Sequence, residues 1–341
     1  MSALMPSVPR VDAGATVSVS AAGRIHLGFL DPSGTLGRRF GSLGLMVDHF
    51  QTEVVIASAA RDEWHADSAA AAAQLDRAIA HVQRLREQCG RGAPLALRLR
   101  SVLPAHAGLG SGTQLALAVG RAFARWQGLD VPTPTLAAWL GRGRRSGIGI
   151  AGFDQGGLLV DGGPSADGAP APLLARMLLP ETWRIVVVLD PRLQGLSGVQ
   201  EAGAIAALPP FPRTEAAELC HQVLMRVLPG AADGAFAPFA AGINRMQELL
   251  GTHFAPAQGG SPLTSASVGR LLQWVRAQAG DQAATGQSSW GPTGFAIVPS
   301  AAAAQRLLDD AHVAGVIDPA LALHVVAARN RGAIVRSATP R

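Results

Sequence analysis

The sequence predicts an α+β protein built from two lobes. Hydrophobic residues make up 48% of the 341 residues, which is enough for a sizeable core. Strand-like and helix-like periodicities are mixed in the first half of the chain, whereas the second half, from about Pro191, is mainly helical. We therefore expect a loose N-terminal tail at residues 1–15, an N-terminal lobe at residues 16–190 and a C-terminal lobe at residues 191–341.

The first lobe is expected to begin with strands. Alternating apolar segments predict strands at residues 16–25, 51–58 and 95–100. Between the last two, apolar residues at helical spacing predict a helix over residues 67–88. Asp67 is its expected N-cap and Gly90 its expected C-cap, because a short polar side chain and a glycine suit those positions.

The rest of the chain continues this mixture. Residues 113–126 are expected to form a helix, and residues 162–172 form a loop rich in glycine, proline and aspartate. Further strands are predicted at residues 157–161, 184–189, 295–298, 321–327 and 333–335. Further helices are predicted at residues 214–228, 234–250, 267–279 and 301–314.

A glycine-rich loop at residues 108–114, Gly-Leu-Gly-Ser-Gly-Thr-Gln, lies between a predicted strand and a predicted helix. Small residues let the backbone approach an anion, and the first amides of a helix have no partner inside it. The helix dipole also favours negative charge there. The loop is therefore a candidate phosphate site, where the hydroxyls of Ser111 and Thr113 either contact the phosphate or cap the helix. His106, just before the loop, is either a further donor or incidental.

A second polar loop, at residues 286–294, places hydrogen-bonding groups around a tryptophan directly before a predicted strand. The hydroxyls of Ser288, Ser289 and Thr293 can hold a carboxylate or a phosphate. Trp290 can stack on an aromatic or sugar ring. The alternative is an ordinary turn.

Two further segments carry charged groups. Strand alternation places Arg24 and His26 on one face, which suits an anionic substrate, although a solvent-facing edge strand has the same pattern. Asp154 lies in a glycine-dense stretch before a predicted strand. It either binds Mg²⁺ through water or caps a turn.

All 29 basic residues are arginine, so no lysine can act as a point charge, Schiff base or general base. A phosphate or carboxylate must therefore be held by arginine, backbone amides or a metal. The net charge of +5 is modest and the arginines are scattered, so we expect no nucleic-acid partner. The densest cluster, Arg142, Arg144 and Arg145, is either a solvated loop or an anion site.

Other features narrow the cellular setting. Cys89 and Cys220 fit no metal-binding or redox spacing, so they are expected to pack as small apolar residues. No apolar stretch reaches the ~18 residues that a membrane span requires, and the first residues do not resemble a signal peptide. We expect a cytoplasmic protein with small-molecule substrates and no membrane association. A homodimer is expected because symmetric dimers are common.

In their order along the chain, these motifs resemble those of the β-ribofuranosylaminobenzene 5′-phosphate synthases, a family that shares the GHMP-kinase fold. The matching segments are residues 24–28, 39–44, 108–114, 145–149 and 286–293. The match spans roughly residues 16–300, and Ser42 stands where the family is expected to have a second glycine. The resemblance implies a GHMP-kinase-like fold with an S5-like N-terminal lobe and a ferredoxin-like C-terminal lobe.

The resemblance also implies an activity: condensation of 5-phosphoribosyl 1-diphosphate with 4-aminobenzoate or 4-hydroxybenzoate, with release of CO₂ and diphosphate, in tetrahydromethanopterin biosynthesis. It implies Mg²⁺ and no organic cofactor. The expected catalytic residues are Arg24, His26 and Asp154, with Asp154 also the metal ligand. The expected phosphate-binding residues are Gly108, Gly110, Ser111, Gly112, Thr113, Gln114, Arg145 and Ser146. The expected substrate-binding residues are Arg39, Ser288, Ser289, Trp290 and Thr293.

Two alternatives are open. One is an ATP-dependent small-molecule kinase of the GHMP type, and the other is a non-catalytic binding protein on the same fold. Kinases of this group commonly carry a lysine near the start of the chain and a glycine-rich third motif. This chain has Arg24 and the sequence Ser-Ser-Trp-Gly-Pro-Thr at those places, which favours the synthase.

Overall fold

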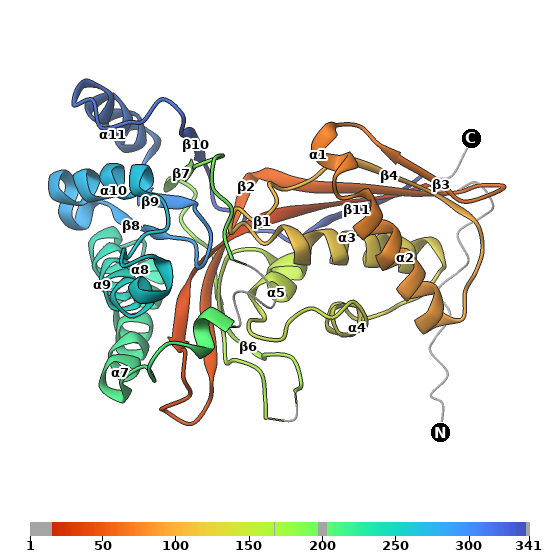
Figure 1. The fold of residues 1–341 in the computed structure, drawn as a ribbon, viewed down its shortest axis with the longest axis horizontal. Helices are drawn as coiled ribbons and strands as arrows, with labels where there is room; N and C mark the ends of the chain where they lie inside the picture. Colours follow the sequence, from red (N-terminus) through yellow and green to blue (C-terminus); the bar gives the residue numbers. More distant parts are fainter. Residues whose placement is uncertain (1–15, 167, 197–202, 339–341) are drawn as a thin grey trace.

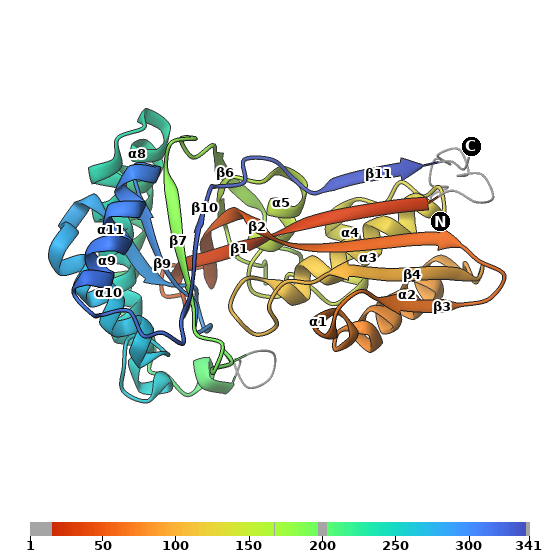
Figure 2. The same cartoon turned by 90° about the horizontal axis from the view of Figure 1, so that it is seen from above.

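A computed structural model describes residues 16–166, 168–196 and 203–338, which form two lobes that are each built around a β-sheet (Figures 1 and 2). The tail expected at residues 1–15 lies outside these ranges. Strands and helices are mixed in both lobes, which confirms the α+β prediction.

The larger sheet has seven strands, and a long antiparallel hairpin of β1 and β2 runs through it. Its order is β11-β1-β2-β4-β3, with β5 paired to both β2 and β6. The strands are β1 (Thr16–Asp31), β2 (Phe40–Ser58), β3 (Glu63–Ala66), β4 (Leu95–Ser101), β5 (Leu158–Asp161), β6 (Leu173–Met177) and β11 (Ile334–Ala338). The β1–β2 hairpin extends beyond this lobe and reaches the other lobe (Figure 1).

Helices cover one face of this sheet (Figure 2). They are α1 (Ala69–Ala72), α2 (Leu75–Cys89), α3 (Ser111–Trp126), α4 (Thr133–Trp139) and α5 (Ile148–Gln155). The apolar face of α3 packs on β1 and β2, where Leu117 and Phe123 are fully buried. This burial fixes the N-terminal end of α3, and with it the glycine-rich loop that precedes the helix.

The helix predicted over residues 67–88 is in fact two helices. Ser68 rather than Asp67 caps the first, because its hydroxyl accepts a hydrogen bond from the amide of Ala71. Asp67 instead pairs with Arg98 on β4 at 2.7 Å. Gly90 ends α2 in a left-handed conformation (φ 61°), as predicted.

The smaller sheet is antiparallel and has the order β10-β7-β9-β8. Its strands are β7 (Arg184–Leu189), β8 (Ala284–Gln287), β9 (Gly294–Val298) and β10 (Ala322–Val326). Alternate residues face opposite sides. Val186 and Val188 pack toward α10 and α11, whereas Ile185 and Val187 join a core shared with α9 and the β1–β2 hairpin.

The helices of this lobe include α7 (Arg213–Gln222), α8 (Leu228–Asp233), α9 (Phe236–Phe254), α10 (Ala266–Ala279) and α11 (Ala301–Val313). A π-helical turn, Val223–Val227, joins α7 to α8, and two 3₁₀ turns lie at Ala255–Gln258 and Gly280–Gln282. The single helix predicted over residues 214–228 is therefore divided. None of the helices in the described ranges is long and apolar enough to cross a membrane.

The boundary expected at residue 190 does not separate the two sheets. β7 precedes that boundary but belongs to the smaller sheet, and β11 from the end of the chain pairs with β1 in the larger sheet. Periodicity predicts single strands and carries no information on their partners, which explains the difference. The short elements that were not predicted are α4, α5, α8, β3, β6 and β8.

Candidate active site

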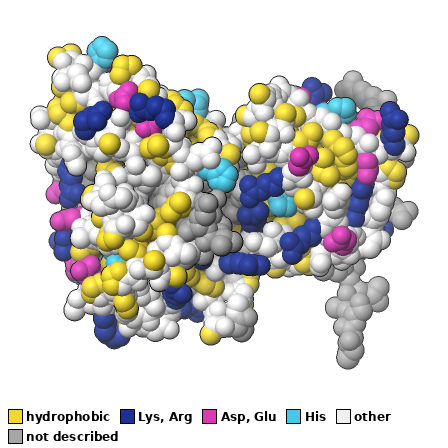
Figure 3. Space-filling model, in the orientation of Figure 1, with side chains coloured by type: hydrophobic (Ala, Val, Ile, Leu, Met, Phe, Trp, Pro, Cys, Tyr) yellow, Lys and Arg dark blue, Asp and Glu magenta, His cyan; other side chains and the backbone are white. Residues whose placement is uncertain are grey.

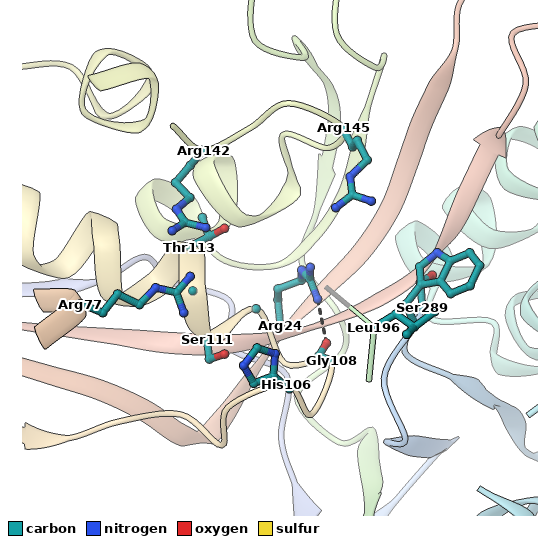
Figure 4. A pocket seen from close by; sticks show the side chains of 13 residues that line it. Arg24, Arg77, His106, Gly108, Ser111, Thr113, Arg142, Arg145, Leu196 and Ser289 are labelled. Carbon is teal, nitrogen blue, oxygen red and sulfur yellow. Dashed lines mark hydrogen bonds between the residues drawn. The ribbon is translucent and has the colours of Figure 1, made fainter. Parts of the chain in front are cut away.

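A cavity of about 300 Å³ lies beside the glycine-rich loop, and residues from both lobes line it (Figure 4). Its described lining is Arg24, Arg77, His106, Gly108, Gly110, Ser111, Gly112, Thr113, Arg142, Arg145, Leu196, Ser289 and Trp290. Four of these residues are arginines. Basic side chains also gather on the face of the larger lobe next to the smaller one (Figure 3). This concentration of positive charge suits an anionic ligand.

The glycine-rich loop forms one wall of the cavity. Gly108 and Gly110 have φ values of 85° and 78°, which residues other than glycine rarely adopt. Gly110 is the N-cap of α3, and no side chain in the described ranges caps that helix end. The N-terminal amides of α3 and the hydroxyls of Ser111 and Thr113 therefore border the cavity as potential donors to an anion, as the sequence suggested.

Arg24 lies against this loop. Its Nη1 donates to the carbonyl of Gly108 at 2.8 Å, and its side chain packs so closely on Gly110 that a Cβ there would lie 3.1 Å from Cγ of Arg24. Irregularities in the β1–β2 register flank the segment, at Ala22/Gly23 and at His26/Gly28. Such bulges change the direction of side chains, and here they accompany an arginine that enters the cavity.

The second polar loop is joined to the first by buried hydrogen bonds. The Ser288 hydroxyl donates to the carbonyl of Gly108 at 2.7 Å and accepts from the amide of His26 at 3.0 Å. Thr293 donates to the carbonyl of Ala107. Both side chains are fully buried and neither lines the cavity. The structure therefore does not place Ser288 and Thr293 where a substrate would touch them, because their hydroxyls join the two loops.

Ser289 and Trp290 do line the cavity. Trp290 is 5% exposed, packs on Phe254 with ring centroids 4.9 Å apart and has a positive φ of 61°. Its buried indole N–H has no hydrogen-bond partner in the described part of the chain. A buried donor without a partner is costly, so this N–H is a candidate contact for a ligand acceptor.

His26 lies behind this wall. It is buried, and its Nδ1 is 2.8 Å from the Ser289 hydroxyl. Burial, together with the positive charges of Arg24 and Arg145, lowers the pKa of His26 well below its usual value. The ring is therefore neutral at neutral pH and is not part of the cavity lining, so the structure supports a positioning role for His26 toward Ser289.

Gln114 and Ser146 also hold the walls without lining the cavity. The buried Gln114 donates from Nε2 to the carbonyl of Gly149 at 2.9 Å, which ties α3 to α5. Ser146 donates to Asp161 at 2.9 Å, and Asp161 also accepts from the amides of Gly147 and Gly163. Burial raises the pKa of Asp161. Because neither Gln114 nor Ser146 lines the cavity, the structure does not place these two residues where a phosphate would touch them.

Arg39 and Asp154 are not brought to the cavity. Arg39 is exposed at the tip of the β1–β2 hairpin, where its guanidinium carbon lies 4.8 Å from the Phe40 ring centroid and its Nε donates to the carbonyl of Pro32. Asp154 is exposed near the C-terminal end of α5 and accepts a hydrogen bond from Thr133. Both residues lie close in sequence to functional motifs. The elements that carry them place both side chains away from the cavity.

The described residues do not form a metal site. No cluster of three or more histidine, cysteine, aspartate or glutamate side chains occurs among them, and the described cavity lining contains no carboxylate. Magnesium prefers oxygen ligands, commonly carboxylates. The residues seen at the cavity therefore do not match a protein-held Mg²⁺, and Asp154 does not line the cavity.

Two of the four lining arginines, Arg77 and Arg142, were not assigned to a site from the sequence. Arg142 belongs to the basic cluster for which a solvated loop and an anion site were both open, and the structure divides that cluster. Arg142 and Arg145 line the cavity, whereas Arg144 is exposed and does not. Arg77 comes from α2, and nothing in its local sequence distinguishes it from other helical surface arginines.

The fold and the phosphate-type loop place the chain in a known structural class. Residues 74–158 match the family model "GHMP kinases N terminal domain", and residues 227–314 match "GHMP kinases C terminal". Two solved structures agree. Homoserine kinase from Cytophaga hutchinsonii has a TM-score of 0.66 at 17% identity, covering 94% of this chain and 97% of its own. Phosphomevalonate kinase from Streptococcus pneumoniae has a TM-score of 0.67 at 12% identity, covering 92% and 99%. The protein therefore has the GHMP-kinase fold.

Curated relatives narrow this class further. β-Ribofuranosylphenol 5′-phosphate synthase from Archaeoglobus fulgidus is 34% identical over 300 residues, which are 84% of this chain and 90% of the relative. The synthase of the same name from Methanothermobacter thermautotrophicus is 29% identical over 93% of this chain and 98% of its own. The chain belongs to the β-ribofuranosylphenol 5′-phosphate synthase family.

Proposed function

We propose that this protein joins 5-phosphoribosyl 1-diphosphate to 4-hydroxybenzoate or 4-aminobenzoate, releasing diphosphate and CO₂. The observation that carries the proposal is the cavity itself. The chain belongs to the synthase family, and its cavity combines four arginines and the N-terminus of α3 with Ser289 and Trp290. Phosphate groups suit the first set, and an aromatic acid suits the second.

The reaction requires one bond to form and two to break. The ring carbon that bears the carboxylate attacks C1 of the ribose, while the C1–oxygen bond breaks and its electrons leave with diphosphate. The bond between the ring and the carboxylate then breaks, its electrons restore the aromatic ring, and CO₂ leaves. An electron-donating hydroxyl or amino group in the para position makes the attacking carbon more nucleophilic, so benzoates without one should react poorly.

The chain's own residues meet the main demands of this chemistry. Arginines and helix amides can stabilise the charge that develops on the departing diphosphate. Buried Trp290 and the joined loops can shield an oxocarbenium-like ribose from water. Hydroxyl donors such as Ser289 can orient the carboxylate while allowing it to leave the ring plane, because they hold it less tightly than a second bidentate arginine would.

Several expectations extend this proposal. We expect magnesium to enter bound to the diphosphate oxygens, because the described cavity lining contains no carboxylate. We place the enzyme in the cytoplasm as a homodimer, within tetrahydromethanopterin biosynthesis. Metal-dependence assays, cell fractionation, sedimentation and complementation of a strain that lacks the pathway enzyme would test these four points.

The test of function uses benzoates labelled in the carboxylate. We expect labelled CO₂ that depends on 5-phosphoribosyl 1-diphosphate, with an equal amount of diphosphate. The Ser111→Glu variant should lose this activity, because a negative side chain would stand at the anion site, whereas the exposed-site control Arg91→Gln should keep it. ATP-dependent phosphorylation of an alcohol without CO₂ would instead establish a kinase. Neither reaction would indicate a non-catalytic protein.

A further inference from the structure

Two arginines from separate elements meet above the first turn of α3. A Cβ built on Gly112 would lie 2.6 Å from Nη2 of Arg77 and 3.4 Å from Nη1 of Arg142. Arg77 comes from α2 and Arg142 from the segment between α4 and α5, and both side chains point toward Ser111 and Thr113 (Figure 4). The glycine at position 112 thus allows two guanidinium groups to approach the end of a helix that itself favours an anion.

These two arginines have no acidic partner among the described residues. Neither forms an ion pair with any residue in the described ranges, and the buried Nε of Arg142 has no hydrogen-bond partner there. Burial and the neighbouring charges of Arg77 and Arg84 lower the pKa of Arg142 to about 10. Like charges held this close repel one another, and a ligand of opposite charge would relieve that repulsion.

We propose that Arg77 and Arg142, with the amides at the start of α3, form the subsite that binds the diphosphate group of the substrate. This inference rests on the proposed function. The ribose and the aromatic acid then occupy the remainder of the cavity, toward Arg24, Ser289 and Trp290. Arg77 and Arg142 stabilise the leaving group.

The layout of the cavity favours the diphosphate over the 5-phosphate at this position. A diphosphate carries more negative charge than a monophosphate, and the Arg77–Arg142 pair adds its charge to that of the helix terminus. A β-riboside forms from an α-diphosphate by inversion, so the aromatic ring attacks from the side opposite the leaving group. Arg77 and Arg142 lie at one end of the cavity and Ser289 at the other, with Arg24 between them (Figure 4).

Binding measurements can test the subsite without turnover. Titration calorimetry would use inorganic diphosphate and, separately, ribose 5-phosphate as probes. We expect Arg77→Gln and Arg142→Gln each to weaken diphosphate binding about tenfold or more, and to change ribose 5-phosphate binding much less. The control Arg91→Gln, on an exposed arginine just after α2 and outside the described lining, should change neither by more than about twofold.

The criterion is the ratio of the two effects. A loss for diphosphate at least five times that for ribose 5-phosphate, about 1 kcal/mol of selectivity, supports the assignment. A smaller ratio, or selective loss of ribose 5-phosphate, overturns it. If the wild-type enzyme releases CO₂ but the ratio is small, only the subsite is wrong. If the ratio is large but no CO₂ is released, the proposed function is wrong and the anion subsite stands.

Thermal unfolding of the free protein provides an independent readout. Because Arg142 lies near Arg77 and Arg84 and forms no ion pair in the part of the chain that the structure describes, its replacement by glutamine should relieve repulsion and raise the Tm of the ligand-free protein. Saturating diphosphate should stabilise the wild type more than the variant. A lower Tm for ligand-free Arg142→Gln would show that Arg142 is structural, which overturns the assignment for that residue.

Discussion

Gly108 and Gly291 lie in direct backbone contact, although 183 positions separate them in the sequence. A Cβ at Gly291 would lie 2.5 Å from Cα of Gly108, and a Cβ at Gly108 would lie 3.0 Å from Cα of Gly291. The phosphate-type loop of one lobe and the tryptophan loop of the other are therefore a single structural unit. Neither glycine can gain a side chain without moving the opposite loop.

Gly291→Ala should damage both loops. The added methyl would meet the backbone of Ala107 and Gly108, so we expect a loss of about 1–3 kcal/mol in the free energy of unfolding. The KM values for both substrates should rise together. Urea denaturation and steady-state kinetics would measure these effects. The control is Gly92→Ala, where a Cβ meets nothing within 4 Å; equal behaviour of the two variants would contradict the prediction.

Arg24→Lys should lose most of the activity. Lysine keeps the charge but lacks the planar fork, so it cannot reproduce both the bond to the Gly108 carbonyl and a ligand contact. Roughly 2–4 kcal/mol of transition-state stabilisation should be lost, measured as kcat/KM. Arg98→Lys, at an exposed ion pair with Asp67, is the matched control. If kcat/KM decreases less than about fivefold in Arg24→Lys, Arg24 does not contribute to transition-state stabilisation.

Trp290 variants can separate a hydrogen bond from ring stacking. Trp290→Phe keeps an aromatic ring but removes the buried N–H, so the KM for the benzoate should rise roughly five- to tenfold while that for 5-phosphoribosyl 1-diphosphate changes little. Trp290→Ala should raise the benzoate KM further and also lower stability, because Phe254 loses its packing partner. A Phe variant with wild-type kinetics would show that the N–H contacts no substrate.

The acid stability of the protein should depend on His81. Burial, and then the charges of Arg142, Arg77 and Arg84, lower the pKa of His81 to about 4. The unfolded chain binds the proton more readily than the folded protein does. The free energy of unfolding is therefore unaffected by protonation of His81 above about pH 6.5 and decreases as the pH falls toward 4. The loss is at most about 3 kcal/mol. Urea titrations across this range should give a flatter profile for His81→Leu but not for the exposed-site control His65→Leu; parallel profiles would refute the assignment.

The sequence by itself determined the local elements that carry the site. A glycine-rich loop followed by an apolar-faced helix predicts the anion-binding N-terminus of α3, because backbone conformation there depends on adjacent residues. The same reasoning located the tryptophan loop and the strand that carries Arg24. The ordered motifs also predicted the family to which the chain belongs. These features need no knowledge of long-range contacts.

Only the tertiary structure decided which side chains reach the cavity. Ser288, Thr293, Gln114 and Ser146 lie in the right motifs but are used for bonds between loops and helices. Arg77, from a helix without any motif, enters the cavity instead. The physical reason is that a side chain's direction follows from how its element packs against distant parts of the chain, and each buried hydroxyl or amide must first satisfy the nearest partner that packing supplies.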